Sequence, residues 1–467
     1  MTGGAPKREV RPSETNGEEG LYGLTTALLR AVRGALNSGD RAYLRELITP
    51  LHAADLADLI ERLRTDERRQ LVAEAGEIVS GEVLAFIEDD VREAILGQLG
   101  ASEVAAAISD LDTDDAVAVL EYLDPPQQRE IIEALPDQAD RVGVRESLTY
   151  PENSAGRLMQ REVISLPAFW TVGQTIDFMR ESDDLPQDFY EIFVVNPRQE
   201  PIGTVRLNRL LRSRRPIRLR DIMEQKLHII PADTDQEEVG YLFDQYDLIS
   251  APVVGASGRL IGVITVDDVL DVVQEETEED IFRLSGVQEA DIYRAALRTA
   301  GGRFVWLLVN LATAILASFV IYQFSGTIEQ MVALAVLMPI VASMGGNAGT
   351  QTLTVAVRAI ATKDLSIGNV YRVFGKETIV GLLNGIVFAV LTGGVAAAWY
   401  EDFALGFVVG GAMVINMLVA GMFGLIIPFV LWRLRIDPAT AAGVLLTTVT
   451  DVIGFLAFLG LAGMFLL

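Results

Sequence analysis

Apolar segments that are long enough to cross a lipid bilayer fill the C-terminal part of the sequence. A transmembrane helix needs about 20 consecutive, mostly apolar residues. Five segments meet this length, at residues 304–324, 331–361, 378–399, 404–431 and 439–467. The sequence therefore predicts an all-α membrane domain of five helices over residues 300–467, and every other part of the chain must lie on one side of a membrane or the other.

Basic residues occur in only some of the connections between these segments. They precede the first segment and follow the second and fourth, as Arg294, Arg298, Arg303, Arg358, Lys363, Arg372, Lys376, Arg433 and Arg435. The connections SGTIEQ and YEDF contain none. Cytoplasmic loops of membrane proteins carry the excess of Lys and Arg. We therefore expect a multi-pass protein of the cell membrane, surrounded by lipid, with its N-terminus in the cytoplasm and its C-terminus outside.

Acidic residues are concentrated upstream of the membrane segments. The chain has 38 Lys and Arg against 64 Asp and Glu, and residues 299–467 contain seven of each kind, so the whole net charge of −26 lies before residue 299. Such a surface repels nucleic acid and attracts metal ions or basic partners, although an acidic face that only keeps a domain soluble has the same composition.

The chemistry available to an enzyme is sparse. The chain has no Cys and two His, and we find neither a phosphate-binding loop nor a nucleophile triad. We therefore expect no enzymatic activity, and transport or sensing remains.

The segment before residue 150 has a short hydrophobic repeat. Residues 1–20 are polar and are predicted to form a disordered tail. Within residues 21–150, a hydrophobic residue recurs every twelve positions, at Leu51, Leu63, Ala75, Ile87, Leu99, Leu111, Leu123 and Leu135. Thr or Asp caps and the pair Pro125 and Pro126 are typical of helix starts. The sequence predicts an acidic domain built as an α-helical solenoid.

Two related copies of a strand-rich pattern follow. Met159 with VISLP and IGTV matches Met223 with LHIIP and IGVITVDD, and Gly203 of the first copy corresponds to Gly262 of the second. This duplication resembles a tandem pair of CBS (cystathionine β-synthase) domains, which are α+β regulatory modules. We expect the first over residues 151–213 and the second over residues 214–267.

CBS pairs often bind adenine nucleotides through a Ser or Thr and an Asp three residues later. Thr265 and Asp268 fit this pattern in the second copy, whereas Arg206 and Arg209 occupy the corresponding positions of the first. The resemblance thus leaves open whether ATP binds in the first cleft, near Tyr190.

An acidic run, DDVLDVVQEETEED, predicts a long connecting helix over residues 268–299. Asp268, Asp271, Glu275 and Glu279 would lie on one face of that helix at spacings of three and four residues, where like charges destabilise an isolated helix. The arrangement predicts a bound cation, and a solvated acidic face is the alternative.

A single acidic residue, Asp451, lies about twelve residues into the last apolar segment. A charged side chain at the bilayer centre costs roughly 2.5–3.5 kcal/mol on insertion scales, so we expect it to face the interior of a helix bundle or a water-filled path. The alternative is a protonated Asp in a packing hydrogen bond. The nearby threonines Thr447, Thr448 and Thr450 fit either helix packing or a pore lining.

The second apolar segment contains MPIVASMGGNAGTQ, with Pro339 and the glycines Gly345, Gly346 and Gly349. We expect these residues to break the helix and to expose carbonyl groups, which together with the amide of Asn347 suit a hard cation or its hydration water. A close helix crossing through small residues is the alternative. Asn416 in the fourth segment is a further polar candidate of the same kind.

Taken together, the run GGNAGTQ, the run DPATAAG, Asp451 within TTVTD, the acidic helix and the order of the domains resemble the MgtE family of Mg²⁺ channels from residue 21 to the end. The resemblance implies a homodimeric, Mg²⁺-selective channel that mediates Mg²⁺ uptake and is closed by cytosolic Mg²⁺. It implies that Asp451 holds hydrated Mg²⁺, that Asn347 with Gly345 and Gly346 forms the selectivity region, and that Asp437 lies at the cytosolic mouth, where the connecting helix acts as a plug.

The resemblance also implies which carboxylates bind regulatory Mg²⁺. They are Asp110, Asp114, Asp235, Glu237, Asp247, Asp268, Asp271, Glu276, Glu279 and Asp280.

Three other functions compete with this one. The first is transport of another divalent cation such as Co²⁺ or Mn²⁺, the second is a proton-coupled carrier, and the third is a nucleotide-regulated sensor without conduction. A carrier would show inverted repeats and further buried ionisable groups, whereas Asp451 is the one such residue that we place well inside the membrane.

Overall fold

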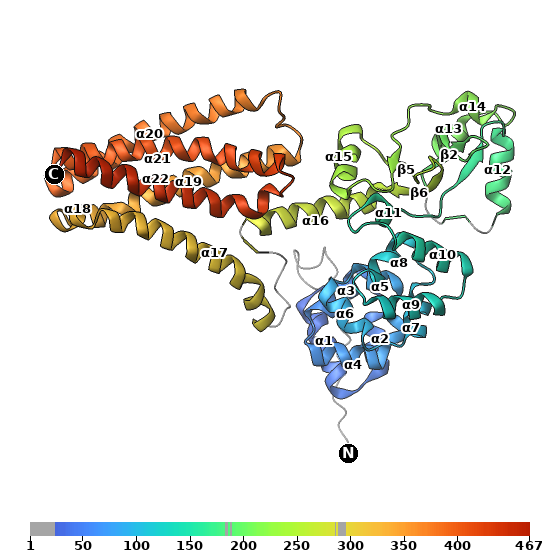
Figure 1. Cartoon of the computed structure of the whole chain (residues 1–467). Helices are drawn as coiled ribbons and strands as arrows, with labels where there is room; N and C mark the ends of the chain where they lie inside the picture. The colour runs from blue at the N-terminus through green and yellow to red at the C-terminus, as the bar shows by residue number, and fades with distance from the viewer. Residues whose placement is uncertain (1–23, 183–184, 187–188, 285, 288–295) are drawn as a thin grey trace, which may run out of the picture. The chain divides into compact units, whose positions relative to one another are not determined.

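The computed structural model describes residues 24–182, 185–186, 189–284, 286–287 and 296–467. The predicted tail of residues 1–20 and Arg294 lie outside the described residues. The chain divides into two compact units, Met1–Val273 and Gln274–Leu467. The first contains the helical domain and the CBS pair, and the second contains the apolar helices, so the predicted fold class is confirmed (Figure 1).

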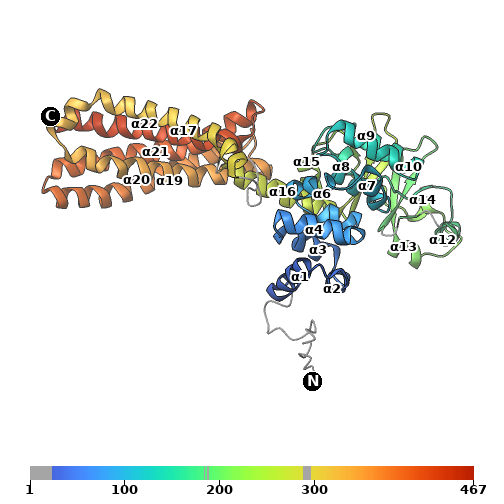
Figure 2. The same ribbon diagram turned by 90° about the horizontal axis from the view of Figure 1, so that it is seen from below.

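Short helices form the N-terminal domain (Figure 2). They are α1 (Thr26–Ser38), α2 (Arg41–Ile48), α3 (Ala53–Arg62), α4 (Thr65–Ala75), the 3₁₀ helix η1 (Gly76–Ile78), α5 (Gly81–Phe86), α6 (Asp89–Leu96), α7 (Ala101–Ile108), α8 (Thr113–Leu120), α9 (Pro125–Ala134) and α10 (Gln138–Ser147).

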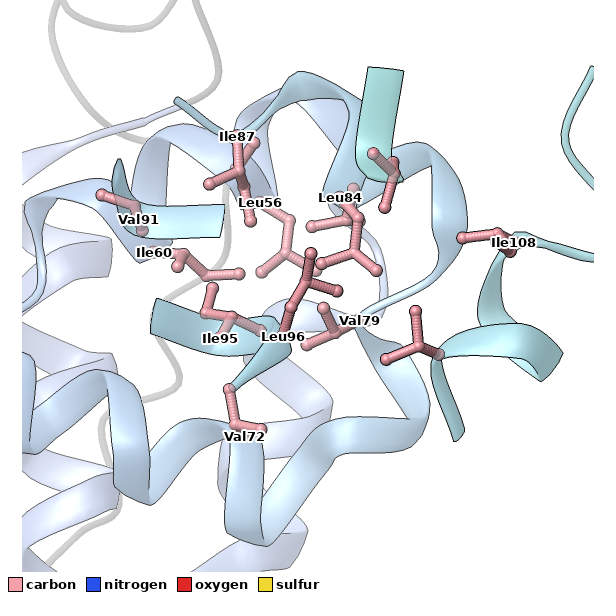
Figure 3. Close-up of a cluster of buried hydrophobic side chains, with 14 of the residues drawn as sticks. Leu56, Ile60, Val72, Val79, Leu84, Ile87, Val91, Ile95, Leu96 and Ile108 are labelled. Carbon is pink, nitrogen blue, oxygen red and sulfur yellow. The ribbon is translucent and has the colours of Figure 1, made fainter. Parts of the chain in front are cut away.

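The twelve-residue repeat explains how these helices pack. Leu63, Ile87 and Leu135 each follow the last residue of a helix, and all three are buried. A cap residue of the next helix follows within one or two positions, as Asp124 does before the helix start at Pro125. Each repeat therefore ends one helix in the core and starts the next. Figure 3 shows part of this core, including Ile87.

The CBS pair consists of two similar mixed sheets. The first copy contains α11 (Ala155–Leu158), β1 (Ser165–Pro167), α12 (Val172–Glu181), β2 (Glu191–Val195), β3 (Pro201–Arg206) and α13 (Leu207–Arg212). The second contains α14 (Leu219–Ile222), β4 (Ile230–Pro231), α15 (Gln236–Tyr246), β5 (Ser250–Val254) and β6 (Leu260–Thr265). In each sheet the first strand pairs parallel with the second, which pairs antiparallel with the third.

The methionine of each CBS copy lies against the matched glycine of the other copy. A Cβ added to Gly203 would lie 2.7 Å from the sulfur of Met223, and a Cβ added to Gly262 would lie 2.8 Å from the sulfur of Met159. Each methionine therefore packs on the sheet of the other copy. This exchange accounts for the repeat that is visible in the sequence.

The acidic run lies in helix α16 (Val266–Leu284). This helix is shorter than predicted, because Gly286 adopts a left-handed backbone with φ of 72°, which ends the helix well before residue 299. The next helix begins at Ala296.

Long apolar helices form the membrane part: α17 (Ala296–Gln323), α19 (Ala333–Ala361), α20 (Val370–Tyr400), α21 (Phe403–Arg433) and α22 (Pro438–Phe465), with the short α18 (Ser325–Gln330) between the first two. Five helices of the described residues are long and apolar enough to cross a membrane, which confirms the predicted number. The first and the third differ most from the prediction, because each begins eight residues earlier, at Ala296 and at Val370. In Figures 1 and 2, α19 to α22 run side by side.

Close contacts through glycine hold α20 and α21 together. A Cβ added to Gly381 would lie 2.7 Å from the carbonyl oxygen of Met417, and one added to Gly393 would lie 2.6 Å from that of Gly406. Small residues of this kind let helix backbones approach in a membrane.

The predicted break in the second apolar segment is wrong. Helix α19 runs without interruption through Pro339 and Gly345 to Ala361. Its neighbours α21 and α22 pack against the glycine side, and a Cβ added to Gly349 would lie 3.0 Å from Leu446. The small residues therefore serve a close helix crossing, the alternative considered above, and the glycines remain inside a helix rather than in an unwound segment.

Candidate functional site

Acidic residues from two distant parts of the sequence meet in the first unit. Asp114 and Asp115 lie in the first turn of α8, and Asp267, Asp268 and Asp271 lie in the first two turns of α16. We call these five residues the α8–α16 cluster. Asp114 is buried, with 7% of its surface exposed. The solenoid and the start of the acidic helix thus contribute to one patch of negative charge.

The electrostatics of the α8–α16 cluster are unfavourable in the absence of a cation. Burial and the charge of Asp268 raise the pKa of Asp114. Burial, and then the charges of Asp112, Asp271 and Asp267, raise the pKa of Asp115 to about 6. Burial is also the main reason why the pKa of Asp268 rises to about 7. These carboxyl groups retain protons because each further negative charge is costly there.

The local partners do not compensate for this charge. Asp268 accepts a hydrogen bond of 2.6 Å from the hydroxyl of Thr265, and one carboxylate oxygen of Asp114 is buried without a hydrogen-bond partner among the described residues. Within the described part of the chain, none of the five cluster residues forms an ion pair with Lys or Arg. The five acidic side chains thus have no positively charged partner among the described residues.

These oxygens fit a hydrated Mg²⁺ ion rather than a fully coordinated one. Within the described ranges, no group of three His, Cys, Asp or Glu residues is arranged to hold a bare metal ion. Mg²⁺ binds through one or two carboxylates and usually keeps several waters. Binding of a hydrated Mg²⁺ ion at the α8–α16 cluster therefore stays a prediction.

The second unit contains a different acidic group. Glu279 and Asp280 lie near the end of α16, and Asp437 caps α22, accepting a hydrogen bond of 2.8 Å from the amide of Ala439. Arg283 donates to Asp437 over 2.8 Å and also pairs with Glu279. We call these four residues the α16–α22 group. Burial raises the pKa of Glu279 and of Asp280, and the guanidinium of Arg283 opposes both shifts.

The end of α16 also has an apolar contact with the membrane helices. Leu284 packs against a buried cluster that includes Leu353 of α19, Leu431 of α21 and Leu446 of α22. The end of α16 therefore contacts Asp437 through Arg283, a residue for which the sequence predicted no role, and the action of this helix as a plug stays a prediction.

Asp451 lies half-buried in the middle of α22, and it makes no hydrogen bond or ion pair with another described residue. The packing alternative requires a hydrogen bond from this carboxyl group, and the structure gives none. The hydroxyl groups of Thr447, Thr448 and Thr450 donate to carbonyl oxygens of their own helix. They neither join helices nor bind Asp451.

The residues of the GGNAG run point in different directions. Asn347 is exposed on α19, whereas Gly345 is buried and Gly346 is partly buried. Asn416 of α21 is fully buried, and its amide nitrogen donates to the carbonyl oxygen of Val341 over 2.8 Å. Asn416 therefore takes part in the packing of α21 against α19, and its predicted place among the pore residues stays a prediction.

Three family models match the chain. Residues 338–461 match MgtE, described as a divalent cation transporter. Residues 51–153 match the MgtE intracellular N domain, and residues 155–215 and 219–275 each match the CBS domain. The protein named magnesium transporter MgtE of Thermus thermophilus is 33% identical over 441 residues, which cover 93% of this chain and 98% of that protein. This chain belongs to the MgtE family.

Further MgtE proteins are similar over comparable lengths. The protein named magnesium transporter MgtE of Bacillus subtilis is 28% identical over 436 residues, 92% of this chain and 96% of that protein. Among solved structures, the cytosolic domain of the Mg²⁺ channel MgtE in complex with ATP is 30% identical and covers 52% of this chain and 99% of that one, with a TM-score of 0.41. The family models and the Thermus thermophilus relative confirm the resemblance to the MgtE family that the motifs predicted.

Several carboxylates that the resemblance assigned to regulatory ions lie apart from the α8–α16 cluster. Asp110 is exposed after α7 and is not among the charges that shift the pKa of Asp114. Asp235 and Glu237 lie at the start of α15, where Asp235 accepts a hydrogen bond of 2.9 Å from the amide of Glu237, and Asp247 lies at the other end of that helix. Glu276 lies one turn before Asp280 and helps to raise its pKa. For these residues the assignment stays a prediction.

The nucleotide positions differ between the two CBS copies as the sequence predicted. Arg206 and Arg209 of the first copy pair with Glu191 and Glu224 at 3.0 and 3.6 Å. Tyr190 is about half exposed, at 49%. In the second copy Asp268 is bonded to Thr265 and also belongs to the α8–α16 cluster, so one carboxylate is shared by the two predicted sites.

The sequence reading missed Asp115, Asp267, Arg283 and Glu377. The first two lie next to predicted ligands, and the helix starts at Thr113 and Val266 could have indicated them. Glu377 was excluded because the third segment was taken to begin at residue 378. It lies inside α20, buried, and accepts a hydrogen bond of 3.3 Å from Thr352 of α19. Asp451 is therefore not the only acidic residue well inside the membrane helices.

Proposed function

We propose that this protein is a Mg²⁺ channel that admits Mg²⁺ to the cell and closes when cytosolic Mg²⁺ binds its acidic domains. The observation that carries the proposal is the α8–α16 cluster, in which Asp114 and Asp115 lie near Asp267, Asp268 and Asp271 without a basic partner among the described residues, and burial raises the pKa of Asp114, Asp115 and Asp268. The names of the relatives support Mg²⁺ as the ion.

The cluster supplies the closing free energy in this proposal. Two carboxylates about 4 Å apart repel each other by roughly 1 kcal/mol in water and by about 4 kcal/mol at an effective dielectric constant near 20. A Mg²⁺ ion between α8 and α16 replaces this repulsion with attraction. Turning a mostly open population into a mostly closed one requires about 5.5 kcal/mol, which several weakly bound ions supply together. Closure is then cooperative, since each ion favours the arrangement that binds the next.

Conduction is assigned to the membrane helices. Asp451 and Asn347 are the proposed contacts of hydrated Mg²⁺, with Gly345 and Gly346 in the selectivity region. The accessible, unpaired carboxylate of Asp451 supports this role. We further propose that two copies of the chain form the pore between them, that the N-terminus is cytoplasmic, and that the C-terminus is outside.

The α16–α22 group is the proposed link between sensor and pore. Asp437 lies at the start of α22, the helix that also contains Asp451, and Arg283 ties it to α16. Glu276, Glu279 and Asp280 are proposed to bind a regulatory ion there. Asp110, Asp235, Glu237 and Asp247 are proposed as further regulatory ligands, and ATP is proposed as a ligand of the CBS pair.

Flux through the purified full-length protein in proteoliposomes tests the proposal. Mg²⁺ entry is measured with a fluorescent indicator while Mg²⁺ on the cytosolic side is varied from zero to about 10 mM, a range suited to weak, shared sites. We expect entry at low Mg²⁺ and a steep decline as Mg²⁺ rises. Entry that is insensitive to cytosolic Mg²⁺ would refute gating, and the absence of flux would favour the sensor without conduction. Replacing Mg²⁺ by Co²⁺ or Mn²⁺ tests the ion preference.

A further inference from the structure

Asn416 is a polar side chain in the centre of the membrane helices, and no solvent reaches it. Its amide nitrogen donates to the carbonyl oxygen of Val341 across the α19–α21 contact, over 2.8 Å. Its amide oxygen is buried and has no hydrogen-bond partner among the described residues. An unpartnered buried carbonyl is unfavourable, and a leucine has nearly the same branched shape without that cost. Stability alone therefore does not explain an asparagine at this position.

The space around Asn416 is shaped by two glycines from two other helices. A Cβ added to Gly345 of α19 would lie 2.2 Å from the amide nitrogen of Asn416, and a Cβ added to Gly454 of α22 would lie 2.7 Å from it. Both distances are shorter than any real contact, so only glycine leaves room for the amide on either side. By contrast, a Cβ added to Gly460, also in α22, would meet no atom within 4 Å.

The two glycines are close in sequence to the two residues proposed to contact the ion. Asn347 follows Gly345 by two positions on α19, and Asp451 precedes Gly454 by three positions on α22. Asn416 of α21 thus lies between α19 and α22. Its amide sets the distance and the register of these two helices.

We propose that Asn416 is a positioning residue, which holds α19 and α22 in the register that lets Asn347 and Asp451 act on the same hydrated divalent ion. The inference rests on the proposed role of Asp451 and Asn347. It assigns Asn416 no contact with the ion itself, because the side chain is fully buried. Its effect is on ion discrimination, since a small change in helix register alters the spacing of oxygen ligands and waters to which Mg²⁺ is more sensitive than Ca²⁺.

The test uses the full-length protein in proteoliposomes, with Mg²⁺ and Ca²⁺ flux measured separately and with the melting temperature in detergent as a folding readout. Asn416→Leu keeps the branched shape and removes both the donor and the acceptor of the side-chain amide. We expect a melting temperature equal to or above that of the wild type. The Mg²⁺ to Ca²⁺ flux ratio should fall by about threefold to tenfold, the range that one interhelical hydrogen bond sets on the population of a helix arrangement. An unchanged ratio in the folded variant would overturn the inference.

A second pair of variants covers the case in which Asn416→Leu does not fold. Gly454→Ala presses on the amide of Asn416, and Gly460→Ala is its matched control in open space on the same helix. The inference expects a reduced flux ratio for Gly454→Ala alone, and equal ratios in both variants would contradict it. Asp451→Asn separates the inference from the proposed function. If that variant conducts like the wild type, the assignment of the ion-binding residue is wrong. If it does not and Asn416→Leu is normal, only the positioning role is wrong.

Discussion

The acidic side chains at the two ends of helix α16 differ in whether a basic residue pairs with them. At its start, the α8–α16 cluster gathers five carboxylates without an Arg or Lys partner among the described residues, and the pKa values of Asp115 and Asp268 rise to about 6 and about 7. Near its end, in the second unit, Arg283 pairs with both Glu279 and Asp437. The start of α16 has no counter-charge among the described residues, whereas the end has the guanidinium of Arg283.

This difference indicates that the two ends of α16 have different functions. In the proposed function, the start of α16 responds to the concentration of a divalent ion, because without one its charges repel each other. The end keeps part of its contact with α22 at any ion concentration, because the guanidinium of Arg283 is always charged. We therefore expect the two ends to respond differently to Mg²⁺, to pH and to charge-removing substitutions.

Both ends of α16 are proposed to control a pore in which Asp451 contacts the ion. Asp451→Asn tests that role of Asp451 and has the largest expected effect. The variant keeps the shape and removes the charge that attracts hydrated Mg²⁺. We expect Mg²⁺ flux to fall by about a hundredfold at saturating gradient, because few carboxylates bind the ion, while the melting temperature and the mass of the assembled protein remain those of the wild type. Asp451→Ala should be at least as impaired. Normal flux in Asp451→Asn would remove this residue from the pore.

Neutralising the first end should abolish most of the response to Mg²⁺. In Asp114→Asn/Asp268→Asn, the cluster loses two charges, and each lost pairwise term is on the order of 1 kcal/mol or more. We expect the Mg²⁺ concentration for half-closure to shift by about tenfold or more, measured by proteoliposome flux across a Mg²⁺ titration. The control Glu130→Gln/Glu133→Gln removes two exposed charges from α9 of the same domain. An equal shift in that control would mean that net charge, and not the cluster, sets the response.

How much of this arrangement the sequence predicts depends on the range of each interaction. The twelve-residue repeat, the duplicated CBS pattern and the apolar segments are periodic or local signals, and they predicted the domains and the number of long apolar helices. The acidic face of α16 was also evident. Its neighbours were not evident, because Asp115 and Asp271 are more than a hundred residues apart and only the folded first unit brings their charges within range of each other.

The errors have local physical causes. Gly345, Gly346 and Gly349 were expected to break α19, but side chains of neighbouring helices fill the space beside Gly345 and Gly349, and the helix continues. Glu377 fell outside the third predicted segment, which began at residue 378, whereas α20 already starts at Val370. Asn416 was grouped with pore residues by its polarity alone, and its burial depends on Gly345 and Gly454 of two other helices.

The pH dependence of the first end gives a smaller effect with a definite sign. A carboxyl group whose pKa is raised in the docked arrangement favours docking below its ordinary pKa and loses that contribution as the pH rises through the raised value. For Asp115 and Asp268 this range extends from about 4, the ordinary pKa of Asp, up to about 6 and about 7.

Without Mg²⁺, the contact of α8 with α16 should therefore be weaker at pH 8 than at pH 5. We expect hydrogen exchange of the α8 amides, corrected for intrinsic rates, to be several-fold faster at pH 8, since one unit of pKa corresponds to about a tenfold change in equilibrium. Addition of Mg²⁺ at pH 8 should restore protection. Protection that is the same at both pH values in the absence of Mg²⁺ would mean that the five carboxylates do not govern this contact.

Replacing Arg283, the basic residue at the end of α16, should have the smallest effect of these substitutions. Arg283 and Asp437 are each about one-third exposed, at 36% and 32% of their side-chain surface, so solvent screens their attraction. Such partly exposed pairs contribute roughly 0.2–1 kcal/mol. Arg283→Gln leaves Glu279 and Asp437 without their shared cation, and the end of α16 then depends more on Mg²⁺. We expect flux at zero Mg²⁺ to rise and half-closure to require up to about threefold more Mg²⁺, with Arg283→Lys closer to the wild type because it retains the charge. If Arg283→Gln instead shifted closure as strongly as Asp114→Asn/Asp268→Asn, the two ends of α16 would be equivalent, and the tethered guanidinium would be a principal part of the sensor.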